Sequence, residues 1–239
     1  LGYKDRSPAR RLEAFMRDLY THMRTIHLIT RMVERRLALR PKPARRLPSL
    51  RSFFGGGKKT ETLDGFNIID GELVPISPRI FKDQPRRLMR VFLHAQQRGL
   101  EFHPDLTQLL RDNVSLVDDD FVHDTENHET FLEVLNQRGN VAPALRAMHE
   151  VDLLGRYIPE FGRMTCLVQH EFFHAYAADE HTLVCLEKLD QVWDAAQPPF
   201  AHYTHILQDI DLPYLLYLAL FLHDTGKGMG SGDHVKDGT

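Results

Sequence analysis

The sequence predicts a mostly α-helical fold with one small β-hairpin. Apolar residues recur at helical spacing along most of the chain. One stretch, residues 61–78, instead alternates apolar and polar residues around an Asp-Gly pair, which is a hairpin signal. The most apolar segment, residues 215–222, is rich in Leu and Ala and indicates a buried helix. With 42% hydrophobic residues in 239, the chain can bury a sizeable core.

The first predicted element is one long helix over residues 8–39. Its apolar stripe is flanked by seven arginines: Arg10, Arg11, Arg17, Arg24, Arg31, Arg35 and Arg36. Residues 1–51 hold 14 Lys and Arg against 4 Asp and Glu, whereas the rest hold 16 against 29. The arginines could form a surface that binds phosphates or an acidic partner. The alternative is a helix face that is simply exposed to solvent.

Residues 40–60 predict a linker or mobile loop, because Pro41, Pro43 and Pro48 interrupt a helix and three glycines follow at Gly55–Gly57. The hairpin comes next, with its turn at Asp70-Gly71.

The middle of the chain predicts short helices. His103-Pro104-Asp105 begins one of them. His123-Asp124 is a second His-Asp pair, but Asp124 or Thr125 is better interpreted as the N-cap of another helix than as part of a metal site. Gly155 is expected to stop a helix, and residues 157–162 are expected to form a turn. The predicted helices are residues 86–98, 106–112, 131–138 and 145–154.

Residues 164–176 are dense in aromatics and histidines. His170, Glu171 and His174 match the H-E-x-x-H pattern of zinc proteases. No third ligand follows at the usual position, so histidines packed on an aromatic core are the favoured interpretation.

The apolar run 215–222 ends abruptly in His223-Asp224, and glycines then break the helix. A carboxylate at the edge of an apolar core is costly unless it is compensated. Imidazole and carboxylate are both ligands of divalent metals, so this pair predicts a metal site. The alternative is a polar helix cap.

Two further histidines strengthen the metal interpretation. His181 lies where a new helical pattern begins, and His234 follows the glycine-rich loop. These residues are too far apart in sequence for a local motif such as a zinc finger. Tertiary packing would have to bring them to one ion.

Composition restricts the class of protein. The net charge of −3 gives no nucleic-acid signature. There is no secretory leader and no apolar run of 18 or more residues, so we expect a cytoplasmic protein without a membrane partner. Cys166 and Cys185 fit free thiols in a reducing compartment. The chain begins at Leu1 without Met, so we expect a fragment.

The segments AYAADEHTL, LLYLALFLHDTGKG and GDH, in that order, resemble the HD-type metal phosphohydrolase domain. The longer segments YIPEFGRMTCLVQHEFFHAYAADEHTL, HDTGKGMGSGDH, PARRLEAFMRDLYTHMRTI and FNIIDGELVPISPRIFKDQPRRLMRVFLHAQQRGLEFHPDL are similar to the bacterial PII uridylyltransferase/uridylyl-removing enzyme family. The resemblance covers nearly the whole chain.

This resemblance implies a helical connector domain over residues 1–115 and an HD-type domain over residues 116–239. The chain ends before the last Asp of an HD site, so this domain is C-terminally incomplete, and the nucleotidyltransferase domain is absent. The implied activity is a metal-dependent phosphodiesterase that removes UMP from a tyrosine of a PII-type signalling protein, in nitrogen signalling.

The resemblance also implies site residues. The metal ligands would be His181, His223 and Asp224, with a divalent ion such as Mg, Mn or Fe as the cofactor. His234 would bind a second ion or the phosphate, and Lys227 would neutralise phosphate charge. His223, Asp224 and Lys227 would be the catalytic residues. Asp179 and Glu180 would orient His181.

Two other functions stay open at this point. One is a non-catalytic regulatory or interaction module with an incomplete HD site. The other is an HD hydrolase of free nucleotides.

Overall fold

The computed structural model describes residues 3, 8–38, 61–168 and 176–229. The described part is mostly helical with one small sheet, which confirms the predicted fold class. The predicted loop 40–60 and the H-E-x-x-H segment lie outside the described residues.

The helices are α1 Pro8–Ala38, α2 Ile80–Asp83, α3 Arg87–Arg98, α4 Pro104–Asn113, α5 Asp119–His123, α6 Thr125–Leu135, α7 Ala142–Glu150, α8 Leu153–Tyr157, α9 Pro159–Arg163, α10 Ala178–Val192, α11 Ala201–Gln208 and α12 Pro213–Leu222, with 3-10 turns η2 Val114–Leu116 and η3 Thr225–Met229.

The sheet contains the predicted hairpin and two strands that were not predicted. β2 (Phe66–Ile69) pairs antiparallel with β3 (Glu72–Pro75) around Asp70-Gly71. β1 (Glu61–Leu63) joins β2 through a second Asp-Gly turn at residues 64–65, and all four turn residues have positive φ. The tight turns follow from this backbone conformation, which Asp and Gly tolerate. β4 (Glu101–Phe102) then lies parallel to β3.

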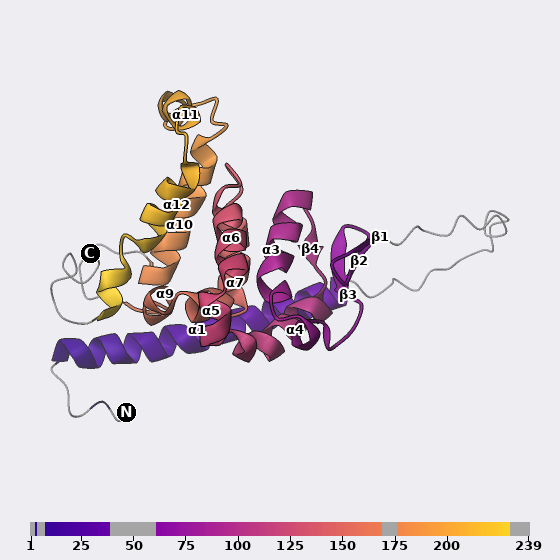
Figure 1. The fold of residues 1–239 in the computed structure, drawn as a ribbon. Coiled ribbons are helices and arrows are strands. Elements are labelled where there is room, and N and C mark those ends of the chain that lie inside the picture. Colours follow the sequence, from indigo (N-terminus) through magenta and orange to yellow (C-terminus); the bar gives the residue numbers. More distant parts are fainter. Residues whose placement is uncertain (1–2, 4–7, 39–60, 169–175, 230–239) are drawn as a thin grey trace, which may run out of the picture.

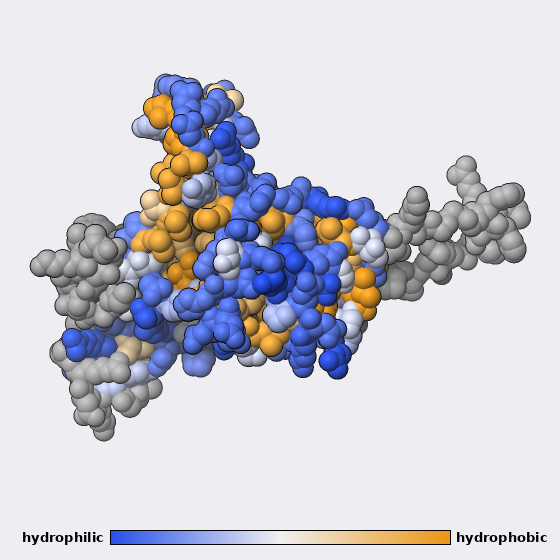
Figure 2. Space-filling model, in the orientation of Figure 1, coloured by the Kyte–Doolittle hydropathy of each residue, from blue (hydrophilic) through white to orange (hydrophobic). Residues whose placement is uncertain are grey.

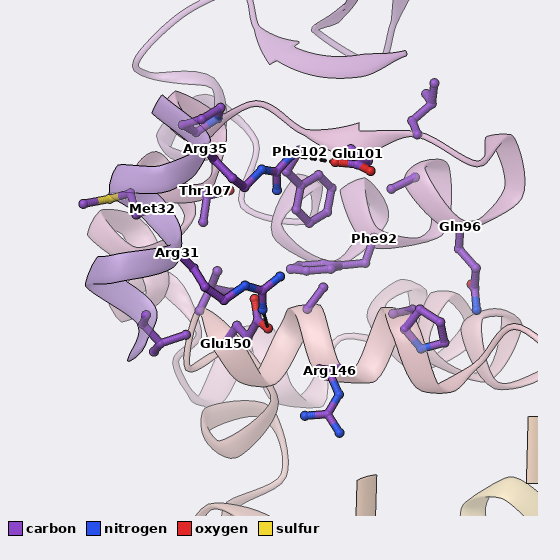
Figure 3. A pocket seen from close by; sticks show the side chains of 18 of the residues that line it. Arg31, Met32, Arg35, Phe92, Gln96, Glu101, Phe102, Thr107, Arg146 and Glu150 are labelled. Carbon is purple, nitrogen blue, oxygen red and sulfur yellow. Dashed lines mark hydrogen bonds and ion pairs between the residues drawn. The ribbon is translucent and has the colours of Figure 1, made fainter. Parts of the chain in front are cut away.

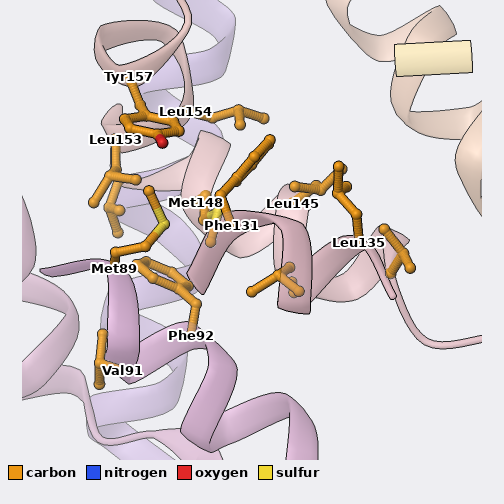
Figure 4. Packing of buried hydrophobic residues seen from close by; sticks show 14 of the residues in the cluster. Met89, Val91, Phe92, Phe131, Leu135, Leu145, Met148, Leu153, Leu154 and Tyr157 are labelled. Atoms are coloured by element: carbon orange, nitrogen blue, oxygen red, sulfur yellow. The ribbon is translucent and has the colours of Figure 1, made fainter. Parts of the chain in front are cut away.

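The hydrophobic core is centred on α3, α6 and α7. Figure 4 shows Met89 and Phe92 of α3 beside Phe131 of α6, Met148 of α7 and Tyr157 of α8. The cluster runs from the sheet to α12 and is continuous across the predicted boundary between residues 115 and 116. The division into two domains stays a prediction.

Helix α1 lies along one side of the molecule beneath the other helices (Figure 1). Its arginines contact carboxylates of the same chain: Arg24 with Asp152 at 3.0 Å, and Arg35 with Glu101 at 2.8 Å. At these positions the arginines therefore pair with carboxylates of the protein itself. The opposite face of α1 leaves apolar side chains such as Ile26 exposed.

Two predictions between residues 150 and 163 are wrong. Gly155 lies inside α8, and residues 157–162 contribute to α8 and α9 instead of a turn. The helical path is interrupted earlier, at Asp152, which has a φ of 65°. The glycines permit a close helix crossing, because a Cβ on Gly162 would lie 2.4 Å from the Gly155 carbonyl oxygen.

The helix start predicted at His103-Pro104-Asp105 and the N-cap predicted at Asp124 are both confirmed. The His103 side chain accepts a hydrogen bond from the Asp105 amide at the start of α4. The Asp124 carboxylate accepts one from the Glu126 amide at the start of α6. His123-Asp124 is thus a helix cap, although α6 starts at Thr125 and not near residue 131.

Helices α10 and α12 project side by side from the body and carry α11 at their tip (Figure 1). Only Pro213, Tyr217 and Phe221 of α12 are buried, although the helix is apolar all round. The remaining apolar side chains form a visible surface along α12 in Figure 2.

Within the described ranges, no single helix combines the length and apolarity needed to cross a membrane. The pair Ala201–Gln208 and Pro213–Gly228 meets those criteria only when its two parts are taken together, and it is bent by 119°.

Candidate metal centre

Three of the predicted ligands converge in the structure. His181, His223 and Asp224 each place a ligand atom so that all of these atoms lie within 4.8 Å of one another. The His223 Nε2 to Asp224 Oδ2 distance is 3.3 Å, and the His181 Nε2 to Asp224 Oδ2 distance is 3.8 Å. The tertiary structure therefore brings together side chains that are 42 residues apart along the chain.

Packing between α10 and α12 sets this convergence. His181 lies in the first turn of α10, and His223 caps the C-terminal end of α12, so the two helices run in opposite directions. Further along both helices, the Tyr217 hydroxyl donates to Asp190 at 2.6 Å and accepts from Trp193 Nε1 at 2.6 Å. These buried hydrogen bonds fix the register of the helix pair.

One hydrogen bond fixes the tautomer of His223. Its Nδ1 lies 2.6 Å from the Leu220 carbonyl oxygen, which can only accept. Nδ1 therefore carries the proton in the neutral ring, and the Nε2 lone pair faces Asp224. Orientation of a ligand histidine by a backbone carbonyl is typical of metal sites.

Asp224 is the centre of charge in the site. Its side chain is only 12% exposed, and Lys227 Nζ donates to its Oδ2 at 2.8 Å. Thr225 donates to the Leu222 carbonyl at 2.7 Å and so closes the end of α12. The η3 turn then packs closely on α9, since a Cβ on Gly228 would lie 2.8 Å from Arg163 Cβ.

Sequence reasoning did not place Cys185 in the site. Its Sγ lies 3.6 Å from His181 Nε2, one helical turn along α10. Burial, and to a smaller extent the negative charge of Asp224, raises the pKa of this thiol above its usual value. The spacing of four residues from His181 was the signal that would have found it.

Asp179 and Glu180 contact α7. The Asp179 carboxylate lies 3.1 Å from His149 Nε2 in a fully buried pair, and Glu180 pairs with Arg146 at 2.9 Å. Both carboxylates therefore tie the start of α10 to α7. Their orientation of His181, which the resemblance implied, stays a prediction.

The donor set fits a divalent first-row metal. Two imidazole nitrogens and one carboxylate are ligands for such ions. Ligand distances of about 2.0–2.2 Å allow donors on opposite sides of an ion to be about 4 Å apart. The observed cluster is close to that size. His234, the fourth predicted ligand, lies outside the described residues.

Sequence comparison shows which known proteins this chain is similar to. Residues 66–157 match the family model described as "Uridylyltransferase GlnD third domain". The bifunctional uridylyltransferase/uridylyl-removing enzyme of Cereibacter sphaeroides is 32% identical over 231 residues, which is 95% of this chain and 24% of that protein. The enzyme of the same name from Nitrosococcus oceani is 33% identical over 253 residues, covering 100% of this chain and 26% of the relative.

Over nearly its whole length, the chain is similar in sequence to bifunctional uridylyltransferase/uridylyl-removing enzymes.

The match has a defined extent. The chain spans about a quarter of the length of the uridylyltransferase/uridylyl-removing enzymes that it matches. The family model ends at residue 157, before the cluster at His181, His223 and Asp224. The pairwise similarity to the two whole enzymes extends over almost all of the chain.

Proposed function

We propose that this chain carries the metal-dependent phosphodiesterase centre of a uridylyl-removing enzyme. The substrate would be a uridylylated PII-type signalling protein, and the role would be in nitrogen signalling. The observation that carries the proposal is the convergence of His181, His223 and Asp224 within 4.8 Å. The name of the relatives, which includes a uridylyl-removing activity, supports the choice of reaction.

In this proposal His181, His223 and Asp224 hold a divalent ion such as Mg, Mn or Fe. The bound ion would supply Lewis-acid polarisation of a phosphoryl oxygen and make a water molecule more acidic. The carbonyl of Leu220 keeps Nε2 of His223 unprotonated and available as a donor. His234 remains the proposed ligand of a second ion or of the phosphate.

The chemistry would be hydrolysis of one phosphodiester bond. A water oxygen bonds to phosphorus and the bond from phosphorus to the tyrosine oxygen breaks. One water proton ends on the tyrosine, and the other goes to the UMP phosphate or to solvent. Lys227 is 18% exposed and carries its charge beside the centre, where it can neutralise charge that develops on the phosphate.

A second candidate function is a non-catalytic regulatory module. One observation favours it: Lys227 Nζ already compensates Asp224 at 2.8 Å, so the carboxylate is neutralised by the protein itself. An ion pair of this kind could stabilise the end of α12 without any metal.

Metal content of the purified chain distinguishes the two functions. We expect the chain to retain Mn or Fe after dialysis, and we expect His223→Ala to lose it, as measured by inductively coupled plasma mass spectrometry. His202→Ala, an exposed histidine on α11, is the matched control and should retain the metal. A folded chain that holds no metal after loading would favour the regulatory module.

Activity is measured on this chain and, in parallel, on a whole uridylyltransferase/uridylyl-removing enzyme, because the chain spans about a quarter of such an enzyme. We expect release of UMP from uridylylated PII protein to require metal and to be lost in His223→Ala and Asp224→Asn. Free nucleotides offered in parallel should be poor substrates. Rapid hydrolysis of free nucleotides with no release from PII would replace this proposal by a free-nucleotide hydrolase.

A further inference from the structure

A separate cavity lies where α1 crosses α3, α4, α7 and β4 (Figure 3). Its volume is about 430 Å³, within the range of small-molecule sites. None of the three residues of the candidate metal centre lines it. A ligand in this cavity would therefore bind independently of the proposed hydrolysis.

Two aromatic rings line the cavity, and Phe102 is the one that a ligand can reach, because Phe92 is only 1% exposed. Phe92 of α3 and Phe102 of β4 are in edge-to-face contact, with ring centroids 5.1 Å apart. Figure 3 shows both rings facing the interior between α1 and α7. An aromatic wall of this kind suits a flat ring or base, which gains contact area without needing a specific hydrogen bond.

Four arginines line the same cavity, and three of them have carboxylate partners. Arg31 pairs with Glu150, Arg35 with Glu101, and Arg146 with Glu180. Arg111 differs. Its one hydrogen bond among the described residues is a 3.4 Å contact to the Glu150 carbonyl.

Arg111 is therefore a half-buried cation without a carboxylate partner in the part of the chain that the structure describes. A guanidinium carries five donors in a planar fork that matches phosphate or carboxylate. Leaving such a group half-buried and poorly paired is costly, so a bound anion would stabilise it.

An unsatisfied acceptor lies elsewhere on the cavity wall. The Gln96 Oε1 atom is buried and has no hydrogen-bond partner. Its orientation is fixed, because Nε2 of the same amide donates to the carbonyls of Val134 at 3.1 Å and Asn140 at 2.6 Å. A buried acceptor of this kind matches an N–H donor on a ligand.

From these four features we propose that the cavity binds a nucleoside monophosphate. The phosphate would pair with Arg111, the base would pack on the Phe102 ring, and an N–H of the base would donate to Gln96. Arginine from α1 and arginine from α4 both line the cavity, so the ligand would also bridge α1 to the body.

The test is calorimetric titration of the chain in EDTA, which keeps the candidate metal centre empty of metal. The probes are UMP and AMP, with inorganic phosphate, uridine and adenosine as partial ligands. We expect at least one nucleotide to bind about tenfold or more tightly than its nucleoside and than phosphate. Binding of neither nucleotide, or equal binding of phosphate alone, would overturn the proposal.

Two variants locate the binding. Arg111→Met should weaken nucleotide binding by about tenfold or more, since it removes the charge but keeps the apolar stem. Ala147→Leu should also weaken it, because it fills the cavity while leaving all four arginines in place. Arg98→Met is the matched control, since Arg98 is exposed, pairs with Glu61 and does not line the cavity.

Thermal melting without ligand identifies variants that remain folded. Unchanged nucleotide affinity in a folded Arg111→Met chain would place the ligand elsewhere and overturn the proposal. A loss of affinity in Arg98→Met equal to that in Arg111→Met would do the same, because it would indicate general attraction between nucleotides and surface arginines.

Discussion

Asp64 shows how one residue can join two parts of the fold. It occupies the first of the two positive-φ positions of the β1–β2 turn, and its carboxylate accepts hydrogen bonds from Arg87 and Arg90 of α3 at 2.9–3.1 Å. His94 Nε2 lies 3.3 Å from the same carboxylate. Asp64 thus attaches the sheet to α3 through a cluster that is mostly shielded from water.

The contacts of Asp64 with α3 lower the pKa of its carboxyl group. Burial alone would raise it, but hydrogen bonds and charge from Arg87, Arg90 and His94 outweigh burial and hold the pKa below the ordinary value of 3.8. The unfolded state therefore binds the proton more tightly than the folded state does. The stabilisation is complete at neutral pH, begins to fall near pH 3.8, and is lost as pH drops through the folded-state pKa.

We expect Asp64→Asn to lower the free energy of unfolding by about 2 kcal/mol at neutral pH. Asn tolerates the positive φ of this turn, so the change tests the charge and not the backbone. Urea unfolding of both proteins at several pH values should show the difference shrinking below pH 3.8.

Asp83→Asn is the control for this prediction. Asp83 makes an exposed ion pair with Arg79, so its loss should change the free energy of unfolding by less than about 0.5 kcal/mol. A difference for Asp64→Asn that is constant across pH would contradict the electrostatic explanation.

At the scale of elements, α1 is attached in an unusual way. The arginines on its inner face pair with carboxylates from β3, β4, α4 and α7 and from Asp152. Apolar residues on its outer face, including Met23 and Ile26, are more than half exposed. Ion pairs therefore make much of the contact between α1 and the rest of the protein. Half-buried apolar side chains such as Leu28 and Met32 make the remainder.

We expect salt to loosen α1 selectively. At about 1 M NaCl the Debye length falls to about 3 Å, which screens exposed ion pairs. Hydrogen–deuterium exchange should then speed up across α1, with α3 as the internal control because its apolar face is buried. Equal acceleration in both helices would indicate general destabilisation instead of release of α1.

At the scale of the whole molecule, one core connects the two predicted segments. Helix α3 from the first segment packs on α6 and α7 from the second. The shared cluster includes Phe92, Phe131 and Met148, all nearly inaccessible to solvent. Neither segment can leave the other without exposing these side chains.

We expect residues 61–229 to unfold in one cooperative transition. Circular dichroism and tryptophan fluorescence should report the same melting temperature, although the single Trp193 lies in the second segment. A fragment of residues 116–239 alone should melt without a cooperative transition. Two separate transitions would instead support an independent connector and HD-type domain.

The sequence by itself determined the local structure and the chemical inventory. Helical spacing predicted α1, α3 and α12, and Asp70-Gly71 predicted the hairpin. The helix start at His103-Pro104-Asp105 and the cap at Asp124 could be predicted because each signal acts within a few residues of itself. The pairing of His223 with Asp224 at the end of an apolar helix identifies candidate metal donors from the sequence alone.

The tertiary structure alone decided which distant groups meet. It placed His181 beside Asp224, and it set the α1 arginines against the carboxylates of the body. It also showed that Gly155 serves a helix crossing and that β4 completes the sheet. Such contacts depend on the packing of whole helices, whose crossing is set by many apolar side chains together. No local pattern encodes that sum, so the partners of a charged or metal-binding residue appear only once the chain has folded.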